Sequence, residues 1–514
     1  MISYLQRGSL IILLMFLVID CLIELPQSLH GQEQPKAAPA TVHYGLRAID
    51  QETGRGVPLV RFKTTNNIVF WSDSQGYVAF NEPGLINTEV HFEVDSPGYE
   101  FPADGFGFRG IRVTPEAGQV HEVRMKRLQP AERIRRLTGQ GIFRDSELMG
   151  LTVPIGEQSL NAGVMGSDSV QMVPYRNRLF WLWGDTNLAH YPLGNFHVTA
   201  ATSALPSSSN FPTTEALELD YFVDKSSNRV KKMLPSEKPG AVWLFGLINL
   251  KESTDRETLV AHYSRHLRLG EMVEHGIAVF DDESQQFQIA KTFELTNTWQ
   301  IPSGQAFRHA DHDGDFVYFA DPFPVVRVPA NLEALCDPLQ YQAYCWDAAL
   351  QQFRWQHEHP PTTQTLEHKL LQEQTLSATA ARFQIAERDT NRPVTIHRAS
   401  VNWNNYRQRW IMIGCEINPS GTPSHLGEVW YAEAPDLTGP WNTAIKIATH
   451  PGYSFYNPRQ HVAWDQADGR YIYFEGTYTQ MFSSTQTATP RYDYNQLLYR
   501  LDLETIILED LNGK

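Results

Sequence analysis

The chain has 514 residues, which is enough for two or three domains. A hydrophobic content of 42% and an aromatic content of 11% indicate a folded protein and exclude a disordered chain. The formal net charge of −15 argues against nucleic acid and anionic membrane surfaces as partners, because both bind clustered lysine and arginine.

The first residues have the layout of an export signal. Arg7 precedes an apolar run over residues 10–23, and a polar stretch follows at 27–32. The run is short for a membrane span, so it predicts a signal peptide over 1–31 and a linker over 32–40, with an uncleaved anchor as the alternative. We expect an exported, periplasmic or extracellular protein that keeps no integral membrane span once the signal is removed.

Residues 41–128 contain short alternating strands separated by Gly and Pro turns, a pattern typical of a small β-sandwich. Within it, Ser72–Tyr77 and Ser96–Tyr99 resemble the carboxypeptidase regulatory-like domains of exported bacterial proteins. The resemblance implies a structural or spacing module. Residues 129–154 are expected to form a charged connector that starts as a helix.

A β-hairpin is predicted within Asn161–Thr202. The apolar run Leu179–Trp183 is bounded by polar turns and fits a strand buried on both faces, and a shorter strand precedes it. The second strand of an antiparallel hairpin returns to the level at which the first began, which places Asp168 and Asp185 at one edge. Two carboxylates at one edge suit acid/base chemistry, and they also fit a solvated turn.

The same pattern, a polar turn or break before a buried aromatic-rich strand, occurs five times between residues 155 and 505. The five strands are Leu179–Trp183, Ala241–Asn249, Phe316–Asp321, Trp410–Glu416 and Tyr471–Glu475. Repeated units of short strands without a helical period predict a β-propeller. The predicted fold is therefore all-β: a five-bladed β-propeller over 155–505, preceded by the small β-sandwich and followed by a tail over 506–514.

In a propeller, the starts of the innermost strands and the ends of the next strands meet at one face. Read in that way, the candidate catalytic residues are Asp168, Asp185, His309, Glu416 and Glu475. The candidate substrate-binding residues are Trp183, Arg308, Asp321, Arg398, Trp403, Tyr456 and Asn457. Carboxylates and amides that hydrogen-bond hydroxyl groups, beside rings that stack on sugar faces, suit a neutral polyhydroxylated ligand.

The segment Asp168–Pro174, followed by a turn and Leu179–Asp185, resembles the first blade of five-bladed propeller glycoside hydrolases, the arabinanase, β-xylosidase and invertase superfamily. Glu428–Trp441 is similar to a strand and turn that those enzymes repeat between blades. The resemblance implies hydrolysis of O-glycosyl bonds, mostly with inversion, and a catalytic base at Asp168.

The remaining catalytic positions match that superfamily less well. Its second acid has no clean match, and Asp185 is the nearest residue by position. The general acid is normally a Glu on a middle blade, where this chain has Arg308–Asp311, so His309 is the candidate, with Glu416 and Glu475 as rivals.

We therefore expect an exported glycoside hydrolase, monomeric and without a cofactor, acting on a neutral poly- or oligosaccharide. The alternative is a non-catalytic propeller that binds carbohydrate or scaffolds a surface complex. Carboxylates at strand ends are more often turn residues than catalysts, and His309 is as compatible with a structural role. No metal-ligand motif occurs, and a cation on the propeller axis is not readable from sequence.

Export implies an oxidising compartment, in which cysteines pair. Cys336 and Cys345 lie in one loop with eight residues between them and are predicted to form a disulfide. Cys415 lies in an apolar strand and is expected to be inert.

Overall fold

The computed structural model describes residues 42–155, 161–195, 197–206, 211–212, 217–253 and 256–506. The predicted signal peptide and linker, and all of the predicted tail except Ile506, lie outside these residues. In the described part of the chain, no helix is both long and apolar enough to cross a membrane.

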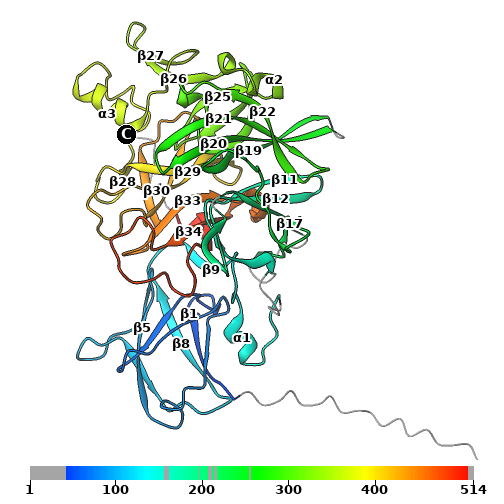
Figure 1. Cartoon of the computed structure of the whole chain (residues 1–514). Coiled ribbons are helices and arrows are strands. Elements are labelled where there is room, and N and C mark those ends of the chain that lie inside the picture. Colours follow the sequence, from blue (N-terminus) through cyan, green and yellow to red (C-terminus); the bar gives the residue numbers. More distant parts are fainter. Residues whose placement is uncertain are drawn as a thin grey trace, which may run out of the picture. The chain divides into compact units, whose positions relative to one another are not determined.

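The first described segment forms two four-stranded sheets that share a core (Figure 1). One sheet has the order β4 (Tyr77–Phe80), β1 (Tyr44–Asp50), β8 (Val120–Arg127), β6 (Tyr99–Glu100), and the other β3 (Val69–Trp71), β2 (Arg61–Thr64), β5 (Val90–Asp95), β7 (Gly110–Val113). Buried and less buried residues alternate along β2 and β5, so that Phe62 and Phe92 point into the common core.

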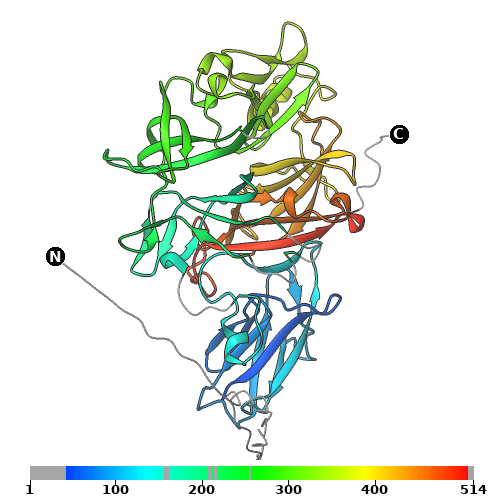
Figure 2. The ribbon, with the colours of Figure 1, turned by 90° about the vertical axis from the view of Figure 1, so that its right-hand side faces the viewer.

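Seven further sheets follow in the described part of the chain, and the five that have four or five strands are numbered I to V (Figures 1 and 2). Sheet I contains β11 (Gln171–Tyr175), β12 (Arg178–Trp183), β15 (Thr199–Ala204) and β16 (Asp220–Tyr221). Sheet II contains β19 (Ala241–Ser253), β20 (Arg256–Arg268), β21 (Glu271–Asp281) and β22 (Gln286–Phe293). Sheet III contains β23 (Gln305–Asp311), β24 (Gly314–Ala320), β25 (Pro324–Pro329), β26 (Gln342–Asp347) and β27 (Gln352–Gln356).

Sheets IV and V each include a strand that is out of chain order. Sheet IV contains β29 (Ile396–Asn404), β30 (Arg409–Glu416), β31 (Val429–Ala434), β32 (Thr443–Ala448) and β28 (Ala386–Glu387). Sheet V contains β33 (Ser454–Gln460), β34 (Tyr471–Thr479), β35 (Asn495–Asp502) and β9 (Glu132–Arg136).

The remaining elements are short. They are strands β10 (Val164–Ser167), β13 (Thr186–Leu188), β14 (Tyr191–Asn195), β17 (Val223–Asp224) and β18 (Arg229–Val230), helices α1 (Arg144–Leu148), α2 (Leu332–Leu335) and α3 (Gln364–Gln372), and single 3₁₀ turns at Asn161–Gly163, Thr298–Gln300, Pro338–Gln340, Val462–Trp464, Ala467–Gly469 and Leu503–Thr505.

Sheets I to V are arranged in a ring. The first strands are neighbours in chain order: β11 lies beside β19, β19 beside β23, β23 beside β29, and β29 beside β33. Sheet V then meets sheet I, where the Ser169 amide donates to Thr477 Oγ1 at 2.9 Å and Arg459 Nη2 lies 3.5 Å from the Met172 carbonyl. Meander sheets around a common axis are the architecture of a β-propeller, and the predicted all-β fold is confirmed.

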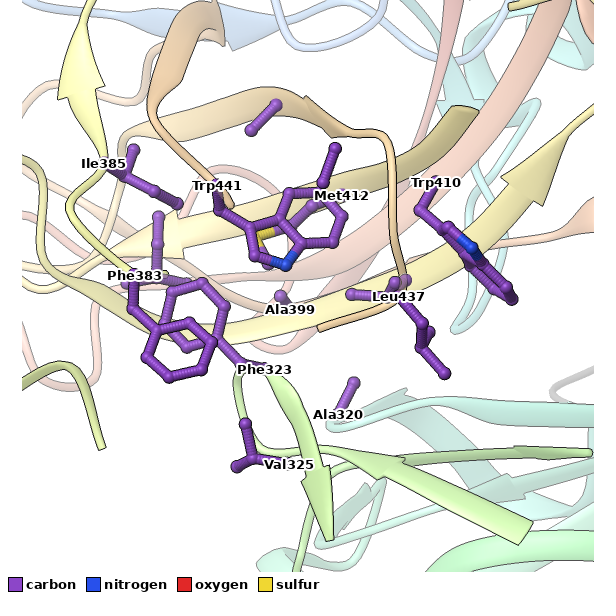
Figure 3. Close-up of a cluster of buried hydrophobic side chains, with 14 of the residues drawn as sticks. Ala320, Phe323, Val325, Phe383, Ile385, Ala399, Trp410, Met412, Leu437 and Trp441 are labelled. Atoms are coloured by element: carbon purple, nitrogen blue, oxygen red, sulfur yellow. The ribbon is translucent and has the colours of Figure 1, made fainter. Parts of the chain in front are cut away.

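Apolar clusters fill the space between neighbouring sheets. Between sheets III and IV, Phe323, Val325, Trp410 and Met412 belong to one buried cluster, in which Trp441 lies over Met412 (Figure 3). Strands inside these sheets, such as β12, β24, β30 and β34, are buried on both faces, which explains their continuous apolar runs.

The predicted helical start of the connector is wrong, because residues 132–136 form β9 and complete sheet V. β9 pairs antiparallel with β35, with Arg136 opposite Leu497 and Glu132 opposite Arg500. Glu132 is buried, accepts from Arg55 Nε at 2.8 Å and lies 2.8 Å from Arg500 Nη2. The run of charges resembles a solvated linker in sequence, but partners from two other segments satisfy this carboxylate.

Candidate functional site

A cavity of about 1040 Å³ lies where the first strands of sheets I to V begin. Each sheet contributes to its wall: Gln171, Trp243, Gln305, Arg398 and Asn457 come from β11, β19, β23, β29 and β33 in turn. Its size is in the range of small-molecule sites, and its position on the axis of the ring makes it the candidate functional site.

The predicted hairpin places its two carboxylates in this cavity. β11 pairs with β12, with Gln171 opposite Leu182. Beyond the paired strands, the Asp168 amide donates to the Asp185 carbonyl at 3.0 Å and the Gly184 amide donates to the Asp168 carbonyl at 2.8 Å. Asp168 and Asp185 both line the cavity, as expected for residues at one edge of the hairpin.

The environment of Asp168 disfavours its charged form. Burial, and secondly the charge of Asp185, raise the pKa of Asp168 to about 7, although a hydrogen bond from Tyr456 OH at 2.8 Å opposes the change. Burial also raises the pKa of Asp185, against a hydrogen bond from Trp243 Nε1 at 2.8 Å. Near neutral pH the pair can therefore hold one proton in the cavity.

Gly184 is required by the close approach of the Asp168 carboxylate. A Cβ at this position would lie 2.2 Å from Asp168 Oδ1, far inside van der Waals contact. The glycine that ends the apolar strand β12 thus makes room for the carboxylate that lies across the hairpin.

Three of the predicted substrate-binding residues line the cavity: Tyr456, Asn457 and Arg398. Asn457 has a positive φ of 51° and donates from Nδ2 to Ser169 Oγ at 2.7 Å, which joins sheet V to the Asp168 loop. Arg398 forms an ion pair with Asp321, a fourth predicted residue, which accepts from the Ser303 amide at 3.0 Å and lies behind the cavity wall.

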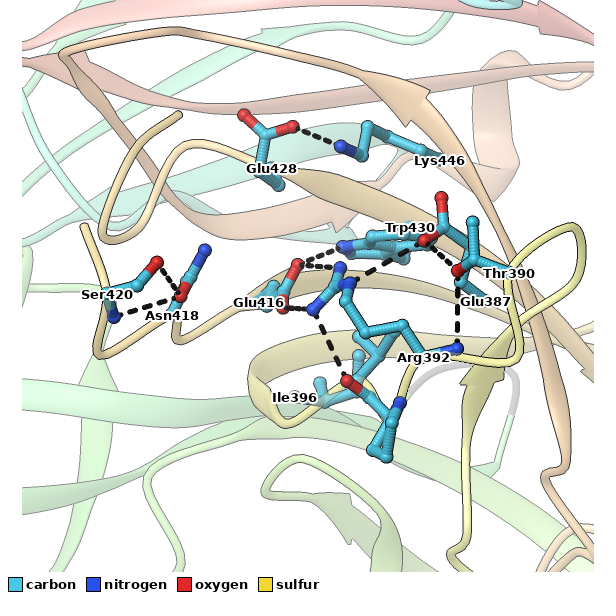
Figure 4. Close-up of polar contacts among 12 residues, drawn as sticks. Glu387, Thr390, Arg392, Ile396, Glu416, Asn418, Ser420, Glu428, Trp430 and Lys446 are labelled. Atoms are coloured by element: carbon cyan, nitrogen blue, oxygen red, sulfur yellow. Dashed lines mark hydrogen bonds and ion pairs between the residues drawn. The ribbon is translucent and has the colours of Figure 1, made fainter. Parts of the chain in front are cut away.

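Glu416 and Glu475 do not reach the cavity, so neither fits the predicted role of proton donor. Glu416 is buried at the end of β30, where Arg392 pairs with it and Trp430 Nε1 donates to it at 2.9 Å (Figure 4). Glu475 is buried in β34 with its Oε1 2.6 Å from His461 Nε2. Both carboxylates are committed to contacts inside the protein.

His309 and Arg308 lie away from the cavity because β23 meets it with its first residue, Gln305. Arg308 forms an ion pair with Asp315, and the His309 ring packs edge-on against Trp410 at 4.9 Å between ring centroids. The cavity therefore includes neither His309, the predicted acid, nor Arg308, a predicted substrate ligand.

The two predicted tryptophans also lie elsewhere. Trp183 is fully buried and stacks on Trp181, with 5.9 Å between ring centroids. Trp403 is at the opposite end of β29 from the cavity, where its Nε1 donates to Asn405 Oδ1 at 3.1 Å. Neither lines the cavity, so neither can bind a sugar there.

The predicted disulfide is absent, and Cys336, Cys345 and Cys415 are free thiols. Cys336 ends helix α2, whereas Cys345 lies in β26 and its buried Sγ donates to the Pro360 carbonyl at 3.1 Å. The short spacing suggested a closed loop, but a helix and a strand hold the two side chains in different surroundings.

Sequence reasoning missed Trp243, Tyr494 and Arg459, which all line the cavity. Trp243 lies inside an apolar run that indicated only a buried strand. Tyr494 is in the segment before β35, which carries no repeat signal. Among the described residues, no group of three or more His, Cys, Asp or Glu side chains could hold a metal ion.

No protein-family profile matches the chain, and no curated protein sequence matches it. Solved structures match its backbone. A provisionally assigned hydrolase from Bacteroides ovatus matches with a TM-score of 0.43 and 12% identity, over 69% of this chain and 89% of that one. An exo-β-1,3-galactanase from Phanerochaete chrysosporium matches with a TM-score of 0.35 and 10% identity, over 66% of this chain and 61% of that one.

An exo-1,5-α-L-arabinanase from a bovine ruminal metagenomic library matches with a TM-score of 0.33 and 11% identity, over 69% of this chain and 97% of that one. All three TM-scores are below 0.5 and no identity exceeds 12%, so these likenesses define neither the family nor the activity of this chain.

Proposed function

We propose that sheets I to V are the blades of a five-bladed propeller in an exported protein, and that its axial cavity hydrolyses a glycosidic bond with Asp168 and Asp185. The observation that carries the proposal is the pair itself: two carboxylates in one cavity, one with its pKa raised to about 7. The rings of Trp243, Tyr456 and Tyr494 around them suit the apolar faces of sugars.

The two carboxylates divide the chemistry as follows. Asp168, protonated near neutral pH, donates its proton to the glycosidic oxygen as the bond to the anomeric carbon breaks. Asp185 accepts a proton from the water whose oxygen bonds to that carbon. The sequence resemblance assigned the base to Asp168, but its raised pKa favours the donor role. Inversion is proposed from that resemblance, and the anomer first released, followed by NMR, tests it.

Non-catalytic carbohydrate binding is the second candidate. It is favoured by the burial of Glu416 and Glu475, since Asp168 and Asp185 are the only carboxylates among the described residues that line the cavity. A binder needs no third acid, because sugar hydroxyl groups donate hydrogen bonds to any carboxylate.

Turnover distinguishes the candidates. Purified protein is screened against plant, algal and mycobacterial polysaccharides, and Asp168→Asn is compared with Asp315→Asn, which changes a carboxylate outside the cavity wall. We expect Asp168→Asn to lower hydrolysis about a hundredfold or more, while the control stays near wild type. No turnover of any polymer by the wild type, with retained saccharide binding, would favour the second candidate.

The pH profile tests the donor role. If Asp168 gives the proton, kcat/KM falls as pH rises through about 7. Tyr456→Phe removes a hydrogen bond that lowers the pKa of Asp168, so the falling limb should move to higher pH. A limb that stays in place would contradict the assignment.

A further inference from the structure

One arginine in the cavity has no partner carboxylate. Arg459 lies on β33, lines the cavity and is only 7% exposed. Its hydrogen bond is the long contact of Nη2 to the Met172 carbonyl at 3.5 Å, and no described acid forms an ion pair with it. Burial alone accounts for the lowered pKa of Arg459, about 10, so its guanidinium remains charged at neutral pH.

The other two arginines in the cavity wall are compensated. Arg398 pairs with Asp321, and Arg268 lies 2.7 Å from Glu271 near the surface. Burial lowers the pKa of His397, and lowers that of His197 to about 4, so neither ring carries a charge at neutral pH. Arg459 is thus the uncompensated cation among the described residues of the wall.

Neither carboxylate of the cavity forms an ion pair with Arg459. Asp168 is held by Tyr456 and Asp185 by Trp243, and neither carboxylate contributes to the pKa of Arg459. A buried guanidinium is unfavourable without an anion, and its planar donors match carboxylate and sulfate oxygens.

We propose that the cavity takes an acidic saccharide, whose uronate carboxylate or sulfate ester pairs with Arg459. The proposal rests on the proposed function for the sugar itself and changes the neutral ligand expected from the sequence. Asp168 would face the glycosidic oxygen and Asp185 the attacking water, while Arg459 holds the anionic substituent. Partial protonation of Asp168 near pH 7 reduces its repulsion of such a ligand.

Binding is measured calorimetrically for D-glucuronate, D-galacturonate and galactose 6-sulfate against glucose and galactose, with inorganic sulfate as the free anion. Proteins are wild type, Arg459→Met, Arg459→Lys and, as a control, Arg308→Gln, an exposed arginine paired with Asp315 outside the cavity wall. We expect at least one acidic sugar to bind about tenfold or more tightly than its neutral counterpart.

Arg459→Met should remove that preference, Arg459→Lys should keep part of it, and Arg308→Gln should leave it unchanged. A preference for neutral sugars in the wild type, or an acidic preference that survives Arg459→Met, would overturn the proposal. Sulfate that binds as tightly as every acidic sugar would assign the site to a free anion and overturn it too. The uronate and sulfate arms decide which substituent is recognised.

Thermal unfolding separates this role from a structural one. If Arg459 were needed to support β11 through Met172, Arg459→Met would lower the melting temperature by several degrees. A charge kept for a ligand gives the opposite result, an unchanged or raised melting temperature, because a buried unpaired cation is removed. A destabilised Arg459→Met that also retains the sugar preference would leave only the structural role.

The outcome is independent of turnover. Preference for acidic sugars with no hydrolysis of any polymer would reject the proposed hydrolase and keep this inference. Hydrolysis of a neutral polymer, with no binding of acidic sugars, would keep the proposed hydrolase and reject this inference.

Discussion

The pKa of Asp168 is raised because three features of its position act on one carboxylate. It is partly buried, it lies beside a second carboxylate, and the absence of a side chain at Gly184 lets it fold across the hairpin. The hydrogen bond from Tyr456 offsets only part of this effect.

Asp168 should therefore make the fold less stable at neutral than at acidic pH. Its folded-state pKa, about 7, is above its unfolded value of 3.8, so its contribution to stability is fully present below about pH 4 and is lost as pH rises through 7. The loss is at most on the order of 4 kcal/mol. In urea unfolding at pH 4, 6 and 8, Asp168→Asn should gain stability over wild type as pH rises. Parallel curves would contradict the raised pKa.

Gly184→Ala should reduce activity more than its size suggests. The new Cβ would meet Asp168 Oδ1 at 2.2 Å and displace the carboxylate, so we expect a loss of about 100-fold in kcat/KM and a destabilisation of about 1–3 kcal/mol. Gly84→Ala, at an exposed turn with no neighbouring atom within 4 Å and no positive φ, is the control for stability at a glycine. Full activity of Gly184→Ala would show that the position of Asp168 is not critical.

At this scale the sequence identified one half of the site. Asp168 and Asp185 could be predicted because hairpin geometry alone brings strand ends together. Glu416 and Glu475 could not be excluded, because a carboxylate at a strand end looks the same whether it faces a cavity or pairs with a cation such as Arg392. Arg459 carried no signal, since the absence of a partner is visible only in three dimensions.

Among the elements, inner strands could be predicted well because burial on both faces leaves a continuous apolar run. The apolar pattern does not predict which residue of each strand lines the cavity. β23 meets it at Gln305 and β29 at Arg398, so residues several positions further along each strand, such as His309 and Trp403, lie outside it. A shift of this kind moves a side chain about 3.3 Å per residue.

Helix α2 and strand β26 keep the two loop cysteines apart, and mass spectrometry can check this. Under denaturing, non-reducing conditions, iodoacetamide should alkylate both Cys336 and Cys345. In the native protein Cys345 should react slowly, since burial raises the pKa of its thiol to about 11. A peptide pair linked by a disulfide would contradict this separation of the two thiols.

At the scale of the whole molecule, β9 joins the first two sheets to the ring. Glu132 on β9 contacts Arg55 of the two-sheet segment and Arg500 of β35, so one buried carboxylate is bonded to both parts. This role could not be predicted from the sequence, because β9 pairs with the distant strand β35 and has no local partner.

Glu132→Gln should therefore destabilise the protein by roughly 3–5 kcal/mol, because Arg55 and Arg500 lose their shared carboxylate. Glu93→Gln is the matched control: Glu93 pairs with Arg61 in a surface contact with 46% and 27% of their side chains exposed, and should change stability by less than about 1 kcal/mol. Urea unfolding followed by tryptophan fluorescence measures both. Equal effects of the two substitutions would contradict the bridging role of β9.

The closure of sheet V also sets an order of events during synthesis. β9 ends at residue 136 and is synthesised early, whereas its partner strand β35 begins only at residue 495. Until β35 is synthesised, β9 lacks its hydrogen-bonding partner, and an unpaired strand can pair with other chains. The two-sheet segment can fold early, whereas the ring cannot close until almost the entire chain has emerged. Chaperone dependence and aggregation of nascent chains should therefore peak late, just before β35 is made.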